Sequence, residues 1–318
     1  MRILITGAAG FIGSHLARLL SANGHEVIGV DSFTPYYDRA IKVRNLQHAQ
    51  NRNAWVFLEK RSSELTAGDL AGVDVVVHLA AQPGVRLSWS AFDTYLDENL
   101  TETNILASRI IEAGVKRVVF ASSSSVYGDG VKYPTSESSR TTPRSPYGVT
   151  KLAGESLWES YALSSELEVA ALRFFTVYGP GQRPDMAIQR LVSAALTGRE
   201  FTLFGNGEQR RDFTYVADVA RACAAACAAP LAEPVTRLNI GGSGDTSMND
   251  LIELVENAVG SPLDLKREPA QRGDVLRTGA DPALARQVLQ WSPQVRISEG
   301  VQRQVAFERS GSFEDWDQ

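Results

Sequence analysis

Tyr147 and Lys151 are four residues apart, a spacing that places two side chains on one face of a helix. At this spacing the Cβ atoms lie roughly 5–6 Å from one another. An ordinary tyrosine has a pKa of about 10 and is a poor base at neutral pH. A neighbouring cation favours the phenolate and lowers that pKa. The pair therefore predicts a base that takes a proton from an alcohol while the carbon gives up hydride.

The residues around this pair place it beside a run of hydroxyl groups. Ser145 and Pro146 are typical of a helix N-cap followed by proline at the first helical position, which puts Tyr147 in the first turn. Ser122–Ser125 follow the apolar run Val118–Phe120, so these serines are expected at the C-terminal end of a strand. Ligands of open α/β sheets bind at that edge.

A glycine-rich turn, Thr-Gly-Ala-Ala-Gly-Phe-Ile-Gly at residues 6–13, lies between the first predicted strand and the first predicted helix. Glycines permit tight turning and a close approach of the backbone, and the helix N-terminus offers amide donors to a pyrophosphate. The turn therefore predicts a dinucleotide site. The residues expected to contact the dinucleotide here are Gly7, Gly10, Phe11, Ile12 and Gly13.

Asp31 ends the second predicted strand and is followed by Ser32 rather than by an arginine. A carboxylate at this point accepts hydrogen bonds from the adenosine ribose and repels a 2′-phosphate. Both residues are expected in the cofactor site, and the cofactor is predicted to be NAD rather than NADP.

Composition excludes several classes of protein. The chain has 318 residues, 43% hydrophobic and 22% charged, with a net charge of −5, which argues against a nucleic-acid surface. No segment approaches ~18 continuous apolar residues, so no transmembrane helix is expected. The chain begins directly in a strand, Arg2–Ile5, which leaves no room for a signal peptide. Cys223 and Cys227, four apart in an alanine-rich stretch, are expected to be buried thiols, and no metal-ligand spacing occurs. A cytoplasmic protein without a metal site is expected.

The first half of the chain alternates apolar strand-like runs with amphipathic segments, which predicts a doubly wound parallel α/β sheet of Rossmann type. A long helix is expected over about 94–113. After residue 175 the pattern changes: the segments 213–229 and 237–240 are expected to return to the large sheet. The prediction is a dinucleotide-binding domain of residues 1–175 plus about 213–242, and a smaller, discontinuous C-terminal domain of residues 176–212 plus 243–318.

Taken together, these motifs resemble the extended short-chain dehydrogenase/reductase family, and within it the nucleotide-sugar epimerases, dehydratases and decarboxylases. The matching segments are residues 6–13, 78–81, 122–128, 147–151 and 211–213. The resemblance implies a tightly held NAD that is regenerated in each turnover, and a UDP-sugar substrate bound by the smaller domain. It adds cofactor contacts at Leu79, Ala80, Ala81 and Asn99, besides Tyr147 and Lys151.

Two longer runs, residues 172–187 and 33–44, are similar to UDP-glucuronate 4-epimerases in particular. Two positions depart from the pattern. Gln182 stands where relatives commonly have tryptophan, and Arg61 stands about where relatives have an aspartate that contacts adenine. The adenine contact is then expected from Ser62 or from backbone.

The resemblance also discriminates among reactions. Family dehydratases carry an Asp-Glu pair where this chain has Ser124 and Ser125, and decarboxylases carry a glutamate at the position of Ser125. What remains is epimerisation at C4 through a 4-keto sugar, with no net redox change. Ser123 occupies the family's catalytic Ser/Thr position, but the neighbouring hydroxyls leave this assignment open by one residue.

Five further residues are expected to bind the substrate. Arg183 is expected to pair with the C6 carboxylate, with Ser124 and Ser125 as additional donors. We hypothesise that this pairing also holds the 4-keto uronate away from the alignment in which it loses CO₂. Resemblance places Arg211 and Arg272 at the diphosphate, Thr176 at the substrate phosphate, and Arg86 at the sugar or diphosphate.

Three alternatives stay open. A 4-epimerase of UDP-glucose or UDP-N-acetylglucosamine is opposed by Arg183, which would have no charge partner. A UDP-glucuronate decarboxylase is opposed by Ser125, and a non-catalytic NAD sensor is opposed by the intact Ser123, Tyr147 and Lys151. Family resemblance further implies a homodimer through the helices near 94–113 and 147–164. The sequence leaves the pathway and the tolerance for other sugars open.

Overall fold

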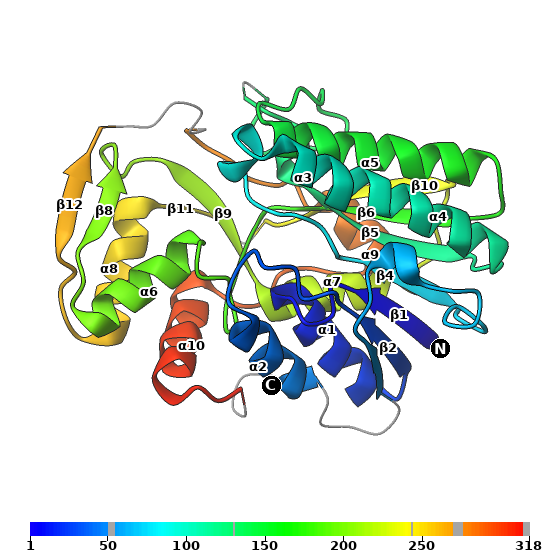
Figure 1. Ribbon diagram of the computed structural model, residues 1–318. Helices are drawn as coiled ribbons and strands as arrows, with labels where there is room; N and C mark the ends of the chain where they lie inside the picture. The colour runs from blue at the N-terminus through cyan, green and yellow to red at the C-terminus, as the bar shows by residue number, and fades with distance from the viewer. Residues whose placement is uncertain (50–54, 130, 243, 270–275, 314–318) are drawn as a thin grey trace.

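The computed structural model describes residues 1–49, 55–129, 131–242, 244–269 and 276–313. Its larger lobe is built on a parallel sheet of seven strands in the order β10-β6-β5-β4-β1-β2-β3 (Figure 1). The strands are β1 (Arg2–Thr6), β2 (Glu26–Val30), β3 (Trp55–Leu58), β4 (Val75–His78), β5 (Arg117–Ser123), β6 (Glu168–Phe174) and β10 (Val235–Ile240). The predicted doubly wound fold is confirmed.

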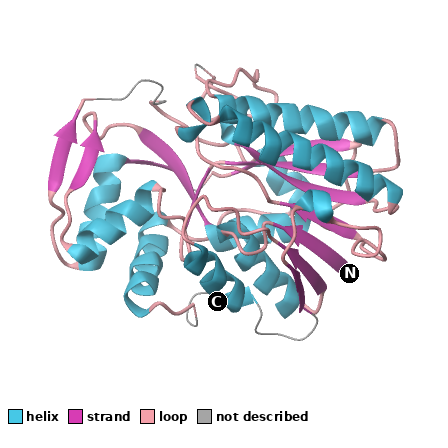
Figure 2. Ribbon diagram, in the orientation of Figure 1, coloured by secondary structure: helices cyan, strands magenta, loops and turns pink. Residues whose placement is uncertain are grey.

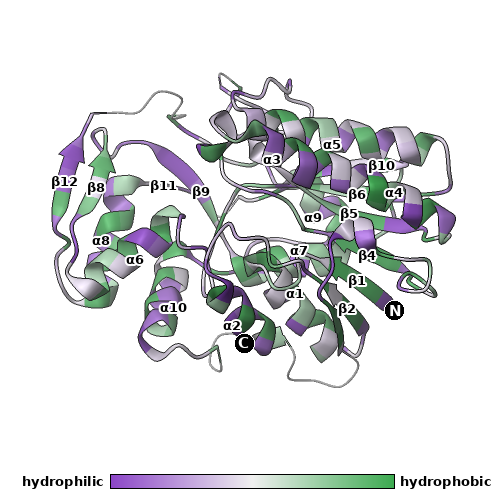
Figure 3. Ribbon diagram, in the orientation of Figure 1, coloured by the Kyte–Doolittle hydropathy of each residue, from purple (hydrophilic) through white to green (hydrophobic). Residues whose placement is uncertain are grey.

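The central strands are apolar on both faces, as Figure 3 shows for β1 and β2. Because successive side chains of a strand point to opposite faces, Ile3 and Ile5 enter one core while Leu4 enters the other. Both cores exist because helices cover both faces of the sheet, which is the usual arrangement for parallel strands.

Each face has its own set of helices (Figure 2). The first set consists of α1 (Phe11–Ala22), α2 (Arg39–Ala49) and α7 (Val216–Ala226), and α9 (Ala283–Leu289) packs against β10. The second set consists of α3 (Phe92–Leu96), α4 (Glu102–Glu112) and α5 (Pro146–Leu163). One turn of π-helix, Asp97–Thr101, joins α3 to α4, so the predicted helix over 94–113 is interrupted in its winding but continuous in its path.

The smaller lobe has its own core, formed by two short sheets and three helices. One sheet has the order β11-β9-β7 and the other pairs β12 with β8. The strands are β7 (Thr176–Tyr178), β8 (Phe201–Phe204), β9 (Arg210–Tyr215), β11 (Asp245–Ser247) and β12 (Leu265–Glu268). The helices are α6 (Ala187–Thr197), α8 (Met248–Val259) and α10 (Ile297–Ser310).

The expected return of the chain to the large sheet is half right. Strand β10 lies beside β6 as predicted. Strand β9, however, pairs with β7 and β11 in the smaller lobe, and only α7, which follows it, packs on α1. The reason is burial: Phe213 and Tyr215 of β9 belong to the core of the smaller lobe, and β10 already covers the edge of β6.

Two further predictions can be compared with the structure. Cys223 and Cys227 are buried free thiols in and just after α7, as expected. Within the described ranges, no helix combines the length and the apolar character that a bilayer-spanning segment requires.

Candidate active site

A cavity opens at the C-terminal ends of β1, β2, β4 and β5, and the motifs of the sequence converge on it. Residues that line it come from the glycine turn, the second strand, the loop after β4 and the tyrosine helix. The predicted site residues among them are Gly7, Gly10, Phe11, Ile12, Gly13, Asp31, Ser32, Leu79, Ala80, Ala81, Tyr147, Lys151 and Arg183.

Two glycines of the turn, Gly7 and Gly13, leave no room for a side chain. Gly7 has a φ of +72°, and a Cβ there would lie 2.8 Å from the backbone nitrogen of Ala80. A Cβ on Gly13 would lie 2.1 Å from the carbonyl oxygen of Gly7. Gly10 is the N-cap of α1 and offers no side chain to the first backbone amides of the helix. These amides face a narrow cradle that suits a pyrophosphate.

Asp31 is fixed at the end of β2 by the backbone around it. One carboxylate oxygen accepts a hydrogen bond from the amide of Ala9 at 3.2 Å, and the other accepts from the amide of Phe33 at 2.8 Å. The ammonium of Lys42 lies 3.6 Å from the second oxygen, and both side chains are buried. The donor set therefore fits the dinucleotide predicted from sequence, with a carboxylate held ready for ribose hydroxyls.

Arg61, the departure from the adenine-contact pattern, pairs with acidic residues at the start of α4 and in the π-helical turn before it. Its Nε donates to Glu102 at 2.9 Å, and Nη2 donates to Asp97 at 2.6 Å. Arg61 and Ser62 both line the cavity. Ser62 therefore lies in the cavity wall, and its contact with adenine stays a prediction.

Tyr147 stands in the first turn of α5, as the capping pattern predicted. The hydroxyl of Ser145 accepts a hydrogen bond from the amide of Gly148 at 3.1 Å, which confirms the N-cap. The structure also separates the serines. The hydroxyl of Ser122 donates to Glu155, whereas Ser123 hydrogen-bonds to the Tyr147 phenol.

Burial dominates the titration of the tyrosine–lysine pair. The ammonium of Lys151 donates to the carbonyl oxygen of Ala121 at 2.9 Å, and burial lowers the pKa of Lys151 to about 8. Burial raises the pKa of Tyr147, and the opposing effects of Ser123 and of the Arg183 charge are smaller. The expectation that Lys151 holds the Tyr147 pKa below its ordinary value is therefore wrong for the ligand-free chain, because the loss of water around the phenol outweighs its charged neighbours.

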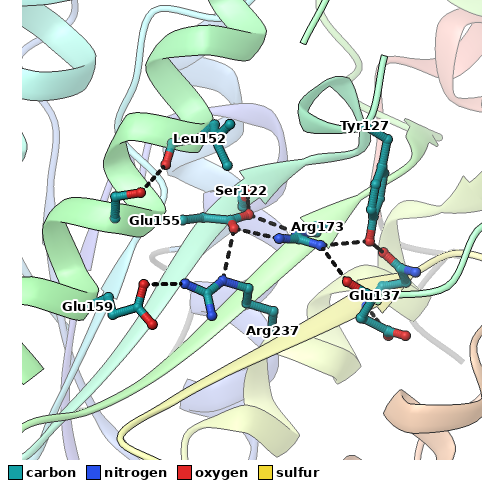
Figure 4. A network of polar contacts seen from close by, with 10 residues as sticks. Ser122, Tyr127, Glu137, Leu152, Glu155, Glu159, Arg173 and Arg237 are labelled. Carbon is teal, nitrogen blue, oxygen red and sulfur yellow. Dashed lines mark hydrogen bonds and ion pairs between the residues drawn. The ribbon is translucent and has the colours of Figure 1, made fainter. Parts of the chain in front are cut away.

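Beneath this pair lies a buried polar network that sequence reasoning missed (Figure 4). Glu155 is one helical turn after Lys151 and accepts two hydrogen bonds from Arg173 of β6, at 2.9 and 2.7 Å. Their side chains are 1% and 3% exposed. The same carboxylate also accepts from Ser122 and from Nε of Arg237, at 3.2 Å in the latter case.

The network extends outward from Arg173 to the loop between β5 and α5. Arg173 donates to the Tyr127 hydroxyl at 2.9 Å, and Tyr127 donates to the side-chain oxygen of Asn239 at 2.7 Å. The backbone amide of Asn239 in turn donates to the Glu137 carboxylate at 2.7 Å. Strands β5, β6 and β10 are thereby joined to the helix that carries Tyr147 and Lys151.

Arg183 lines the cavity, but its guanidinium already has a carboxylate partner. Nε donates to one oxygen of Asp185 and Nη2 to the other, each at 3.0 Å. The Tyr36 hydroxyl donates to the second oxygen at 3.2 Å. The sequence analysis gave neither Asp185 nor Tyr36 a role. Asp185 is only two residues from Arg183, but the fold is needed to bring Tyr36 to this pair.

The lining of this cavity, within the described residues, does not include the other predicted substrate residues. Ser124 and Ser125 form a half-buried 3₁₀ turn, and Thr176 is half-buried at the start of β7. Arg211 of β9 donates to the carbonyl oxygen of Arg210 at 2.9 Å.

Arg86, Asn99 and Arg272 differ in position. Arg86 is exposed, and its guanidinium lies 5.4 Å from the centre of the Phe204 ring in the smaller lobe. Asn99 is buried, and its amide nitrogen donates to Gln82 and to Thr150 at 3.1 and 3.0 Å, which ties the loop after β4 to α5. Arg272 lies outside the described residues.

Comparison with known proteins agrees with this geometry. A Bacillus subtilis (strain 168) protein, YtcB, described as an uncharacterized UDP-glucose epimerase, is 40% identical over 96% of this chain and 98% of its own. A probable UDP-glucuronate 4-epimerase of Rhizobium meliloti (strain 1021) is 37% identical over 96% of each chain. The crystal structure of a Bacillus cereus UDP-glucuronic acid 4-epimerase with UDP-glucuronic acid and NAD superposes with a TM-score of 0.92, at 36% identity, over 98% of this chain and 100% of that one.

The family model of the NAD dependent epimerase/dehydratase family matches residues 3–241. That range contains the glycine turn, Asp31 and the pair Tyr147 and Lys151. The chain therefore belongs to the NAD-dependent epimerase/dehydratase family and uses NAD as its cofactor.

Proposed function

We propose that this protein is a UDP-glucuronate 4-epimerase, which interconverts UDP-glucuronate and UDP-galacturonate through a 4-keto intermediate. The observation that carries the proposal is the position of Arg183. Its guanidinium lines the same cavity as Tyr147 and is close enough for its charge to act on the phenol. A sugar whose C4 hydroxyl meets Tyr147 then has its C6 group near a cation, which suits a carboxylate.

The residues of the chain divide the work as follows. Tyr147 accepts the proton of the C4 hydroxyl and later returns it, and Ser123 hydrogen-bonds to the phenol and guides that proton. Lys151, whose ammonium is held by the carbonyl oxygen of Ala121, lines the same cavity and is proposed to contact the bound cofactor. Bound NAD supplies the acceptor and then the donor of hydride at C4, so there is no net redox change. Rotation of the keto sugar between the two transfers inverts C4.

The serine turn supports epimerisation over the rival outcomes of a 4-keto sugar. Ser124 and Ser125 offer hydroxyls where an acid would be needed to expel a hydroxyl group or to assist the loss of CO₂. Arg183 holds the carboxylate charged during the lifetime of the ketone. The same constellation of Ser123, Tyr147 and Lys151 opposes a purely NAD-sensing role.

We propose that residues 1–175 with about 216–242 bind NAD, and that residues 176–215, which include all of β9, with 243–318 bind the UDP-sugar. Arg211 and Arg272 are proposed to contact the diphosphate, Thr176 the substrate phosphate, and Arg86 the sugar or diphosphate. The support is the separate core of the smaller lobe, which also carries Arg211 on β9.

We also propose a homodimer that works in the cytoplasm. Helix α5, one of the helices named for the interface, carries exposed apolar side chains: Val149 is 47% and Leu163 73% exposed. The two buried free thiols suit a reducing compartment. Light scattering of the purified protein is expected to give twice the mass of the chain, and a Val149→Asp variant is expected to give the mass of one.

The enzymatic proposal is tested by proton NMR of UDP-glucuronate, and separately of UDP-glucose, incubated with the purified enzyme without added reductant. Growth of UDP-galacturonate to a stable mixture is the expected result. Turnover of UDP-glucose with UDP-glucuronate inert would instead assign the protein to the neutral-sugar 4-epimerases, the alternative that the name of the B. subtilis relative favours.

A further inference from the structure

The Arg183 guanidinium is already paired with a carboxylate of the same chain. Asp185 accepts two parallel hydrogen bonds from Nε and Nη2, each at 3.0 Å, which is the bidentate geometry of a strong arginine–carboxylate pair. The Tyr36 hydroxyl holds one oxygen of Asp185 from the opposite side at 3.2 Å. The Arg183 side chain is 18% exposed and that of Asp185 is 40% exposed, and Arg183 and Tyr36 both line the cavity.

This internal pair changes what a neutral sugar meets in the site. An arginine without a partner would be left desolvated by a sugar that carries a C6 hydroxymethyl group, and such unpaired charges are costly. With Asp185 in place, Arg183 keeps its partner when that sugar binds. The argument that Arg183 by itself excludes neutral sugars therefore fails on this geometry.

The same pair also changes what a uronate meets. Its carboxylate must either share the guanidinium with Asp185, at the cost of two like charges side by side, or displace Asp185 from it. Both routes weaken the gain that Arg183 would otherwise give to a charged C6 group. Asp185 therefore acts in opposite directions on the two classes of substrate.

We propose that Asp185, held by Tyr36, is a specificity-determining residue: it serves as an internal carboxylate for Arg183 and thereby lets the site accept neutral UDP-hexoses besides UDP-uronates. This inference rests on the proposed 4-epimerase function for the placement of the sugar C6 group near Arg183. It deepens that function by naming the residue that sets the breadth of the substrate class.

The test measures binding without turnover. In a Tyr147→Phe background with NAD bound, the dissociation constants of UDP-glucuronate and UDP-glucose are measured by calorimetry, with and without Asp185→Asn. The expected result is that Asp185→Asn shifts the ratio of the two constants toward the uronate by more than about threefold, the size expected when the carboxylate of the pair is partly exposed. Tyr36→Phe, which keeps the charge pair but removes its support, is expected to shift the ratio in the same direction by less.

Two results would overturn the proposal. The first is a ratio of the UDP-glucuronate and UDP-glucose dissociation constants that changes by less than about threefold in Asp185→Asn but does change in Arg183→Ala. The second is weaker binding of UDP-glucuronate in Asp185→Asn, which would mean that Asp185 only holds Arg183 in place. Asp264→Asn is the matched control, since it makes the same charge change at an exposed residue outside the cavity lining. Wild-type enzyme that binds both sugars but epimerises neither would refute the proposed function and leave this binding result standing.

Discussion

Replacing Glu155 by glutamine removes a buried charge on which three groups converge. The carboxylate accepts two hydrogen bonds from Arg173 and one each from Ser122 and Arg237 (Figure 4). Glutamine keeps the size of the side chain but replaces one acceptor oxygen with an NH₂ group, which would face the arginine donors. Arg173 would then remain charged in the core, where its side chain is 3% exposed.

The magnitude follows from that burial. Removing one partner of a buried ion pair costs about 3–5 kcal/mol, because the other charge stays desolvated. The same chain offers a control one helical turn further on. Glu159 pairs with Arg237 at 2.8 Å, but these side chains are 43% and 28% exposed. An exposed pair contributes about 0–1 kcal/mol, so Glu159→Gln is expected to change the free energy of unfolding by no more than that.

The assay is urea unfolding of wild type, Glu155→Gln and Glu159→Gln at one fixed NAD concentration, because a ligand of the native state shifts the apparent stability. A third variant, Glu155→Gln with Arg173→Met, removes the stranded charge and is expected to lose less than the sum of its single changes. Equal losses in Glu155→Gln and Glu159→Gln, within about 1 kcal/mol, would refute the reasoning that burial of the Arg173 charge sets the cost.

Three further predictions concern the cavity. Burial lowers the pKa of Lys151 from 10.5 to about 8, so between these values the unfolded chain keeps a proton that the native chain releases, and the free energy of unfolding rises with pH. Lys151→Met should lack this rise in urea unfolding measured from about pH 7 to 10. A difference in unfolding free energy between wild type and Lys151→Met that stays the same at every pH would refute the argument. Asp31→Asn leaves Lys42 without its carboxylate, so the ratio of NADP to NAD affinity is expected to rise by roughly tenfold in calorimetry; an unchanged ratio would contradict the role of Asp31. Arg183→Ala is expected to release extra UDP-4-keto-pentose, detected by NMR, whereas weaker binding with unchanged product purity would reject the hypothesis that Arg183 protects the keto uronate from losing CO₂.

Much of the site could be predicted from local sequence patterns. The glycine turn, the N-cap at Ser145 and the spacing of Tyr147 and Lys151 each lie within a few residues, so helix and turn geometry fixes them without knowledge of the rest of the chain. The alternation of apolar strands and helices was sufficient to predict the doubly wound sheet, since its strands are buried on both faces.

Long-range pairing could not be predicted in the same way. Strand β9 was expected in the large sheet and lies in the small one, because the core that buries Phe213 is assembled from distant segments. Tyr36 and Asp185 meet although they are 149 residues apart. The rise of the Tyr147 pKa also escaped prediction, since desolvation depends on everything packed around the phenol and not on the residue four positions away.

By itself, then, the sequence determined which chemical groups stand at the cofactor turn, on the catalytic helix and at the end of β5, because these depend on local backbone geometry. Only the packed chain shows which serine lies by Tyr147, that Tyr36 supports Asp185 beside Arg183, and which buried network holds β5, β6 and β10 to α5. Hydrogen-bond partners and burial are properties of the packed chain, and residues far apart in sequence become neighbours only when strands and helices pack together.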